Sequence, residues 1–208
     1  MALNSHKIIG VTILAALPGI VTMSMVWGMG ILQNILWMLL FAALIDLTSL
    51  KLKAKPLSQY QRIYPSSALT VLLIAIGLPP AVTPEVLLVA CLASLGLARE
   101  AYAGIGRNVF NPAMVGYAVI FLAYPQQLAI WPSDLNGLSG ATLLTEFKYR
   151  DSLTISEFIS IHESAQQSGL MVACSFFLGG TFLLYKKIIT WHIPLTIMAT
   201  IVVLAQWG

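Results

Sequence analysis

The stretch IIGVTILAALPGIVTMSMVW, residues 8–27, decides the fold class of this chain. It contains no charged residue, and it matches the roughly 20 apolar residues that a helix needs to cross a hydrocarbon core about 30 Å thick. Membrane helices tolerate a proline such as Pro18. The run also lacks a convincing small-residue cleavage site, so we interpret it as a first membrane span and not as a cleavable signal peptide.

The composition extends this interpretation to the whole chain of 208 residues. Hydrophobic residues make up 58% of the chain and charged residues only 9%, whereas about a quarter of the residues are charged in a typical soluble domain. Only internally hydrogen-bonded backbone is stable in lipid, so we predict an all-α polytopic membrane bundle without a sheet in the membrane. About seven transmembrane helices are expected, some of them broken, at residues 8–27, 31–50, 66–82, 85–103, 110–124, 168–185 and 188–207.

The spans divide the chain into three parts. Residues 1–124 form an N-terminal bundle of about five helices, residues 125–167 a long polar connection, and residues 168–208 further transmembrane helices. Alternate crossings put nine of the eleven basic residues on one side, which the positive-inside rule makes cytoplasmic. We therefore expect a cytoplasmic N-terminus and an extracytoplasmic 125–167 connection. The nine are Lys7, Lys51, Lys53, Lys55, Arg62, Arg99, Arg107, Lys186 and Lys187, and the other two are Lys148 and Arg150.

Prolines interrupt two of the predicted spans. Pro79 and Pro80 end or break the third span, because proline removes a backbone donor and clashes with the preceding turn. Asn111 and Pro112 stand at the start of the fifth. We favour an ordinary first-turn proline there, and a midplane break of the kind seen in transporters is the alternative.

Charged residues within or next to the spans need partners or access to water. Asp46 is the only acidic residue placed inside a span before the long connection, and such a carboxylate suggests function by default. Asp46 is close to Lys51 in the sequence, which favours a structural role near the cytoplasmic interface with lysines as its partners. Arg99 and Glu100 look like a cytoplasmic helix end whose charges reach the interface. A position along a cofactor or ion path is the alternative.

Within the long connection, Thr154 and Glu157 fit a capping box, in which each side chain satisfies a free backbone donor of the other residue. We expect a short helix to begin there, with Ile155, Phe158 and Ile159 on one apolar face. It lies either on the outer membrane surface or packed over the bundle.

Several other kinds of site are not expected. The three histidines are scattered without the spacing of metal ligands. Gly104 and Gly106 follow no strand and lack a third glycine, which argues against dinucleotide binding. Ser139 has no nucleophile-elbow motif, so a catalytic serine is not expected there. No nucleic-acid partner is expected either. Cys91 and Cys174 lie in apolar runs, and we interpret them as small packing residues.

Two stretches carry a resemblance to known proteins. Residues 102–117, YAGIGRNVFNPAMVGY, closely resemble the glycine-rich segment and Phe-Asn-Pro-Ala-Met signature shared by the D subunit of the Rnf electron-transport complex and the B subunit of the sodium-pumping NADH:quinone reductase. Residues 67–80 and 191–194 resemble neighbouring segments of these families in matching order. Ser139, Gly140, Ala141 and Thr142 stand at the place in the outer loop where these families carry covalent FMN.

The resemblance implies the first half of that fold and a definite role for Thr142. A flavin transferase joins the FMN phosphate to this hydroxyl through a phosphoester, and the small Gly140 and Ala141 let the bulky group approach the backbone. Thr145 is the nearest alternative acceptor. A second, non-covalent flavin stays open, and departures from the family pattern at Arg107 and Val109 count against it.

As a function, the resemblance implies membership of an ion-translocating, Rnf-type ferredoxin:NAD oxidoreductase complex in the bacterial inner membrane. Such a membrane subunit carries electrons through FMN without a complete active site of its own, and the other subunits of the complex, the flavin transferase and the bilayer are its partners. The short stretch before the first span favours the Rnf D subunit, and the quinone-reductase B subunit is the alternative.

One half of a urea- or ammonium-type channel is a second alternative, because fold alone does not settle function. Pro79-Pro80 and Asn111-Pro112 then mark pore half-helices, and Thr142 is an ordinary loop residue. The resemblance further implies a second half of the bundle. We therefore interpret the end of the chain at Gly208 as that of a fragment, a truncated product or half of a split subunit.

Overall fold

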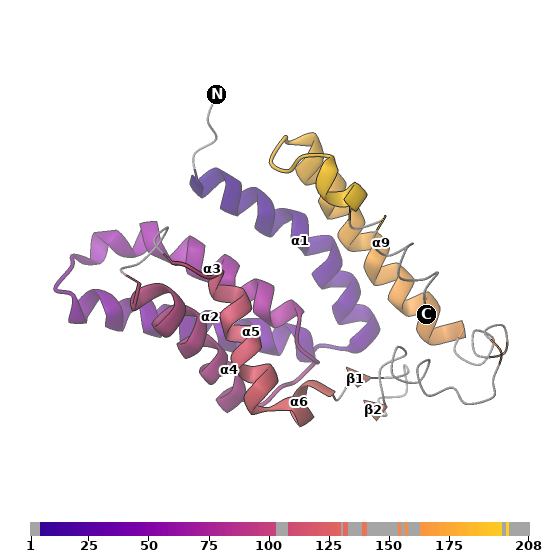
Figure 1. The fold of residues 1–208 in the computed structure, drawn as a ribbon, viewed down its shortest axis with the longest axis horizontal. Helices are drawn as coiled ribbons and strands as arrows, with labels where there is room; N and C mark the ends of the chain where they lie inside the picture. Colours follow the sequence, from indigo (N-terminus) through magenta and orange to yellow (C-terminus); the bar gives the residue numbers. More distant parts are fainter. Residues whose placement is uncertain are drawn as a thin grey trace.

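The computed structural model describes residues 5–102, 108–129, 131–132, 139–140, 154, 157, 163–196 and 199. The described chain is helical apart from one pair of two-residue strands, which confirms the predicted all-α class (Figure 1). The elements are α1 (Ser5–Trp27), α2 (Gly30–Leu52), the 3-10 turn η1 (Leu57–Gln59), α3 (Tyr60–Ile76), α4 (Pro84–Cys91), the π-helix η2 (Leu92–Glu100), α5 (Pro112–Ala123), α6 (Pro125–Ala129), β1 (Trp131–Pro132), β2 (Ser139–Gly140) and α9 (Glu163–Tyr185).

Three helices are long and apolar enough to cross a membrane. They are α1, α2 and the Gln167–Tyr185 part of α9, and α5 is a shorter apolar helix. The helical membrane bundle is thereby established, while the count of seven spans stays a prediction. Half of the last predicted span, 188–207, lies outside the described residues, and the described half shows a turn and a short helical stretch at 192–196.

Two predicted breaks lie where the prolines put them. The third span was predicted at 66–82, but α3 runs from Tyr60 to Ile76, because the helix accommodates Pro65 and ends before Pro79-Pro80. Pro112 is the first residue of α5, and the Asn111 side chain accepts a hydrogen bond from the Ala113 backbone nitrogen at 3.0 Å. This confirms the first-turn interpretation of Pro112, because an N-cap side chain and an N1 proline are typical of helix starts.

The main core lies between α2, α3, α4, η2 and α5. Buried residues recur every three or four positions along α2, which is the spacing of one helix face. The α5 helix packs closely against its neighbours, because a Cβ on Gly116 would lie 2.9 Å from the carbonyl oxygen of Ala90. Large side chains filling this core include Met38, Ile74, Leu78, Leu87, Leu95 and Ile120.

The α1 and α9 helices form an antiparallel pair beside this core (Figure 1). The two backbones approach so closely that a Cβ on Gly179 would collide with the carbonyl oxygen of Ala15. Further along the pair, the hydroxyls of Thr22 and Ser175 are 2.7 Å apart. A second, smaller core of Met23, Ile31 and Val172 joins α1, α2 and α9.

The contacts between helices define two ends of the bundle. At the first end, Ser49 and Lys53 from the end of α2 meet Glu100 at the end of η2. At the second end, the last residue of α1, Trp27, contacts Trp131, and α6 and the strand pair lie there too (Figure 1). The lysines that follow α2 and the start of the long connection therefore lie at opposite ends.

Two local features complete the described fold. The turn between α1 and α2 contains Gly28 with φ +89°, a conformation that favours glycine. Thr154 and Glu157 make the predicted capping box: the Glu157 backbone nitrogen donates to Thr154 Oγ1 at 3.4 Å and the Thr154 backbone nitrogen to Glu157 Oε2 at 3.0 Å. Hydrogen bonds from Thr154 hold the pKa of Glu157 below its ordinary value. The helix expected after them, with Ile155, Phe158 and Ile159, lies outside the described residues.

Candidate functional site

The first half of the predicted flavin tetrapeptide forms strand β2. Ser139 and Gly140 pair in antiparallel register with β1, so that Gly140 lies opposite Trp131 and Ser139 opposite Pro132. The second half, Ala141 and Thr142, lies outside the described residues, as does Thr145. The structure therefore describes only the first two residues of this predicted site, which pair with β1.

Trp131 connects the strand pair to the helical bundle. Its ring centroid is 5.3 Å from that of Trp27, with an interplanar angle of 73°, an edge-to-face arrangement that is favourable for aromatic pairs. Trp27 in turn packs against the small core of Met23, Ile31 and Val172. The strand pair is therefore docked on the end of α1.

The Asn-Pro signature and the tetrapeptide lie at opposite ends of α5. Asn111 caps the start of this helix, and the chain leaves its far end through α6, whose Leu128 is buried in the main core. The 12 residues of α5 correspond to about 18 Å of helix. The two motifs that carried the resemblance therefore do not form one contiguous site in the described structure.

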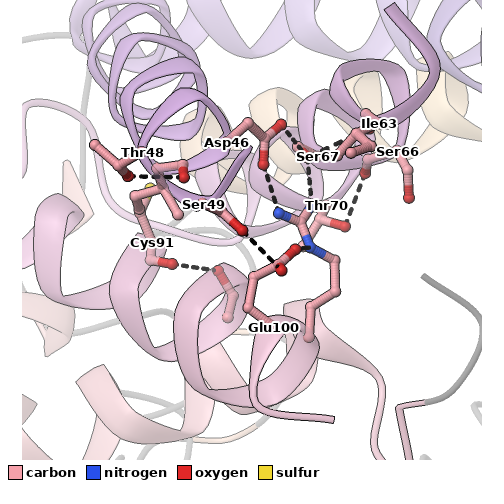
Figure 2. A network of polar contacts seen from close by, with 12 residues as sticks. Asp46, Thr48, Ser49, Ile63, Ser66, Ser67, Thr70, Cys91 and Glu100 are labelled. Carbon is pink, nitrogen blue, oxygen red and sulfur yellow. Dashed lines mark hydrogen bonds and ion pairs between the residues drawn. The ribbon is translucent and has the colours of Figure 1, made fainter. Parts of the chain in front are cut away.

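A network of charged residues that the sequence did not predict lies at the first end of the bundle (Figure 2). Arg99 Nη2 forms an ion pair with Asp46 Oδ1, and Arg99 Nη1 donates a hydrogen bond to Ser67 Oγ. Ser67 Oγ donates to Asp46 Oδ2 at 2.6 Å. The network links α2, α3 and η2, because each of them contributes one of these three residues.

This geometry corrects two predictions from the sequence. Asp46 is only 1% exposed and its partners are Arg99 and Ser67, so the predicted pairing with interfacial lysines is wrong. Arg99 is 3% exposed, so the prediction that its charge reaches the membrane interface is also wrong. The reason in both cases is that the side chains lie on the buried faces of their helices, where only an opposite charge makes burial tolerable.

The network extends from Arg99 to the surface through Glu100. Arg99 Nε donates to Glu100 Oε1 at 3.0 Å, and Ser49 Oγ donates to Glu100 Oε2 at 2.8 Å. Lys53 completes it with an ion pair to Glu100, and its side chain is 38% exposed. Two carboxylates and two cations thus balance in charge. Throughout the described chain every buried side-chain nitrogen or oxygen has a hydrogen-bond partner, those of this network included.

Asn34 is a further buried polar residue that no sequence pattern had singled out. Its Nδ2 donates to the carbonyl oxygen of Pro79 at 2.7 Å, and its Oδ1 accepts from the backbone nitrogen of Val82 at 3.1 Å. Gly30 on the same helix lies so close to this turn that a Cβ would be 2.6 Å from the Ala81 nitrogen. Asn34 therefore satisfies the backbone that the proline break leaves free.

The remaining candidate positions form no visible site. Gly104 and Gly106 lie outside the described residues. Within the described ranges, no group of three histidine, cysteine, aspartate or glutamate side chains could hold a metal ion. Cys91 is buried in the main core, and Cys174 is exposed on α9.

Known proteins resemble this chain along nearly all of its length. The D subunit of the ion-translocating oxidoreductase complex from Ectopseudomonas mendocina (strain ymp) is 31% identical over 215 residues, which covers 93% of this chain and 62% of that protein. The protein of the same name from Pseudomonas aeruginosa (strain LESB58) is 32% identical over 208 residues, covering 89% of this chain and 60% of the relative. The one from Alcanivorax borkumensis is 31% identical over 221 residues, covering 94% and 64%.

The chain thus spans somewhat less than two thirds of the length of these relatives. A family model matches a still longer part of it, residues 2–207. The chain belongs to the NQR2, RnfD, RnfE family.

Proposed function

We propose that this chain is the membrane subunit of an Rnf-type, ion-translocating ferredoxin:NAD oxidoreductase complex and carries electrons through FMN attached covalently to Thr142. The observation that carries this proposal is the family match over residues 2–207, in a chain that has Ser-Gly-Ala-Thr at 139–142. The relatives named above are all D subunits of an ion-translocating oxidoreductase complex, which favours this assembly over the sodium-pumping quinone reductase.

Two features of the described residues beside the tetrapeptide support this proposal. Gly140 has no side chain, and its cross-strand neighbour Trp131 is an aromatic residue fixed to the bundle by Trp27. A threonine hydroxyl is a chemically suitable acceptor for a flavin nucleotide whose phosphate carries a leaving group. The Thr142 oxygen would form a bond to the phosphorus, the phosphorus–oxygen bond to the leaving group would break, and the hydroxyl proton would leave with that group. When bound, FMN supplies the redox chemistry, and the protein's part is to hold and orient it.

The proposed placement in the cell is a bacterial inner membrane with the N-terminus in the cytoplasm and the 125–167 connection outside. The support is electrostatic, since Lys51, Lys53 and Lys55 lie at the end of the bundle opposite α6 and the strand pair. Basic loops are retained on the cytoplasmic side. The flavin would then be on the outer face, where it exchanges electrons with other subunits of the complex.

Fluorescence of the denatured protein tests the proposal. The chain is expressed together with a flavin transferase and run on a denaturing gel, where only covalent flavin stays with the band. We expect a fluorescent wild-type band, a dark Thr142→Ala band and an unchanged Ser139→Ala band. A dark wild-type band overturns the proposal, and a fluorescent Thr142→Ala band moves the acceptor elsewhere, with Thr145 the first residue to examine.

A further inference from the structure

The segment that joins α2 to α3 at the first end of the bundle is strongly basic. It contains Lys51, Lys53 and Lys55, and Arg62 follows in the first turn of α3. Residues 47–84 contain no aspartate or glutamate. The basic side chains of this segment therefore have no opposite charge close to them along the chain.

Only one of the four cations has an acidic partner in the fold. Lys53 forms its ion pair with Glu100. Lys51, Lys55 and Arg62 are exposed, and they form no ion pair with an acidic side chain in the part of the chain that the structure describes. Three positive charges at this end are therefore available to a negatively charged group from outside the chain.

Backbone hydrogen bonds fix the shape of the turn that carries these lysines. The Ala54 nitrogen donates to the carbonyl oxygen of Lys51 at 3.1 Å, the Lys55 nitrogen donates to that of Leu50 at 2.9 Å, and Ala54 has φ +49°. This is the Schellman pattern that closes a helix C-terminus. Lys51 and Lys55 thus belong to one closed turn, which lies at the extreme left of Figure 1, beyond the other described helices.

Two leucines of the same segment indicate that it lies at the membrane surface. Leu52 is 87% exposed and Leu57 is 71% exposed. The α2 helix ends at Leu52 after 23 residues, which correspond to about 35 Å of helix. This is slightly more than the hydrocarbon thickness of about 30 Å. The end of α2 therefore emerges near the boundary between acyl chains and headgroups, where leucines reach the acyl chains and lysines reach the phosphates.

Aromatic rings at the start of α3 support the same depth. Tyr60 and Tyr64 stack with their ring centroids 5.0 Å apart, and both are partly buried. Tyrosine is enriched at membrane–water interfaces, because its ring is apolar and its tip is polar. Cations, leucines and tyrosines at one level match the chemistry of a phospholipid, whose phosphate lies just above its acyl chains.

We infer that the segment 51–62 binds the phosphate groups of anionic phospholipids in the leaflet at this end of the bundle, through Lys51, Lys55 and Arg62. Basic residues immediately outside a membrane helix attract anionic lipids. Lipid is favoured over an acidic protein as the partner because the segment lies where α2 leaves the bilayer and exposes two leucines there. Binding of this kind does not need FMN at Thr142, so it can be tested apart from the proposed function.

A lipid titration of the whole chain in a neutral detergent tests this binding. Dioleoylphosphatidylglycerol, dioleoylphosphatidylcholine or inorganic phosphate is added, the melting temperature is recorded, and native mass spectrometry measures the affinity for each lipid. We expect phosphatidylglycerol to bind more tightly than phosphatidylcholine and to raise the melting temperature, and inorganic phosphate to have no effect.

A variant with two substitutions, Lys51→Gln and Lys55→Gln, removes two of the three unpaired cations. Each basic residue near an anionic surface contributes about 1 kcal/mol, which is about fivefold in affinity. The variant should therefore bind phosphatidylglycerol about 25-fold more weakly than the wild type and bind phosphatidylcholine unchanged.

A matched control removes two lysines that follow α9. Lys186 and Lys187 are exposed, and Lys186 Nζ lies over the rings of Phe182 and Tyr185. Lys186→Gln with Lys187→Gln removes the same charge from the chain and should keep the preference for phosphatidylglycerol. Circular dichroism confirms that each variant is folded.

Three results would overturn the inference. The first is a wild type that binds the two lipids equally or that inorganic phosphate stabilises as strongly as phosphatidylglycerol. The second is an equal loss of affinity in the two double variants, because binding then follows total charge and not this segment. The third is a Lys51→Gln, Lys55→Gln variant that keeps its lipid preference but no longer copurifies with other subunits of a complex, because the segment then contacts protein.

Discussion

Asp46 on α2 and Arg99 on η2, which are 53 residues apart in the sequence, form an ion pair buried inside the helical bundle. Ser67 from α3 bonds to both of them, so the pair fixes three elements against one another. The pair lies one step inward from Glu100 and Lys53, through which the network reaches the surface.

Removing one member of the pair should destabilise the bundle. Arg99→Met leaves a buried carboxylate without its counter-charge, and losses of about 3–5 kcal/mol are typical of such changes. The double variant Asp46→Leu with Arg99→Met should recover most of the lost stability, because well-packed apolar residues replace buried ion pairs at little cost. Thermal unfolding in detergent measures both.

Lys53→Met is the matched control, since it removes only the exposed cation of the network and should cost less than about 1 kcal/mol. A double variant as unstable as Arg99→Met alone would show that the network contributes more than charge compensation.

The burial of Asp46 and Arg99 could be predicted from the sequence, but their pairing could not. Asp46 follows Met38 and Ala42 at intervals of four residues, so it lies on the buried face of α2, and Arg99 follows Cys91 and Leu95 in the same way. The expected pairing with lysines was based on the closeness of Asp46 to Lys51 along the chain. It did not take into account the four-residue spacing that places Asp46 on the buried face. Periodicity assigns a residue to a buried face, but it does not say which helix lies opposite, so the partner itself needs the tertiary structure.

Asn34 should be needed for the shape of the Pro79-Pro80 break. Asn34→Leu leaves the Pro79 carbonyl and the Val82 nitrogen buried without partners, and each unsatisfied group costs about 1–3 kcal/mol. We expect a clearly lower melting temperature in detergent. The neighbouring Gln33 is exposed, so Gln33→Ala serves as the control and should leave the melting temperature unchanged. Equal melting temperatures for the two variants would contradict this role of Asn34.

The α1–α9 pair should depend on one of two adjacent glycines. A methyl group at residue 179 would collide with the backbone oxygen of Ala15, so Gly179→Ala should force the helices apart at a cost of about 1–3 kcal/mol. Gly180 has nothing within 4 Å of its Cβ position, so Gly180→Ala should be neutral or slightly stabilising. Comparing the unfolding of the two variants tests the packing directly, and a reversed order of stability would contradict the described pair.

The composition and apolar runs were enough to predict the helical membrane bundle, because lipid restricts the backbone to few choices. Prolines marked the end of α3 and the start of α5 well. The start of α3 was misplaced because its first turns, around Arg62 and Pro65, are too polar to score as a span but are helical all the same. The tetrapeptide was found by resemblance, whereas its pairing with Trp131 has no sequence signal, since two-residue strands carry no periodic pattern.

Labelling from outside the cell should distinguish the two ends of the bundle. In a background without Cys91 and Cys174, we introduce Lys55→Cys at the basic end and Gln126→Cys on α6. The positive-inside rule predicts that a membrane-impermeant maleimide labels position 126 in intact cells, and position 55 only after the cells are broken. Labelling of position 55 but not of position 126 in intact cells would reverse the proposed orientation.

Peptide mass spectrometry of the chain expressed with a flavin transferase shows directly whether Thr142 carries FMN. The peptide containing Thr142 should gain the mass of FMN less one water. Thr142→Ala should remove this gain without preventing membrane insertion, because one loop hydroxyl contributes little to packing. Thr142→Ser should keep part of it, since a hydroxyl remains. A wild-type peptide without the added mass, or with the mass on Thr145, would contradict the assignment of Thr142.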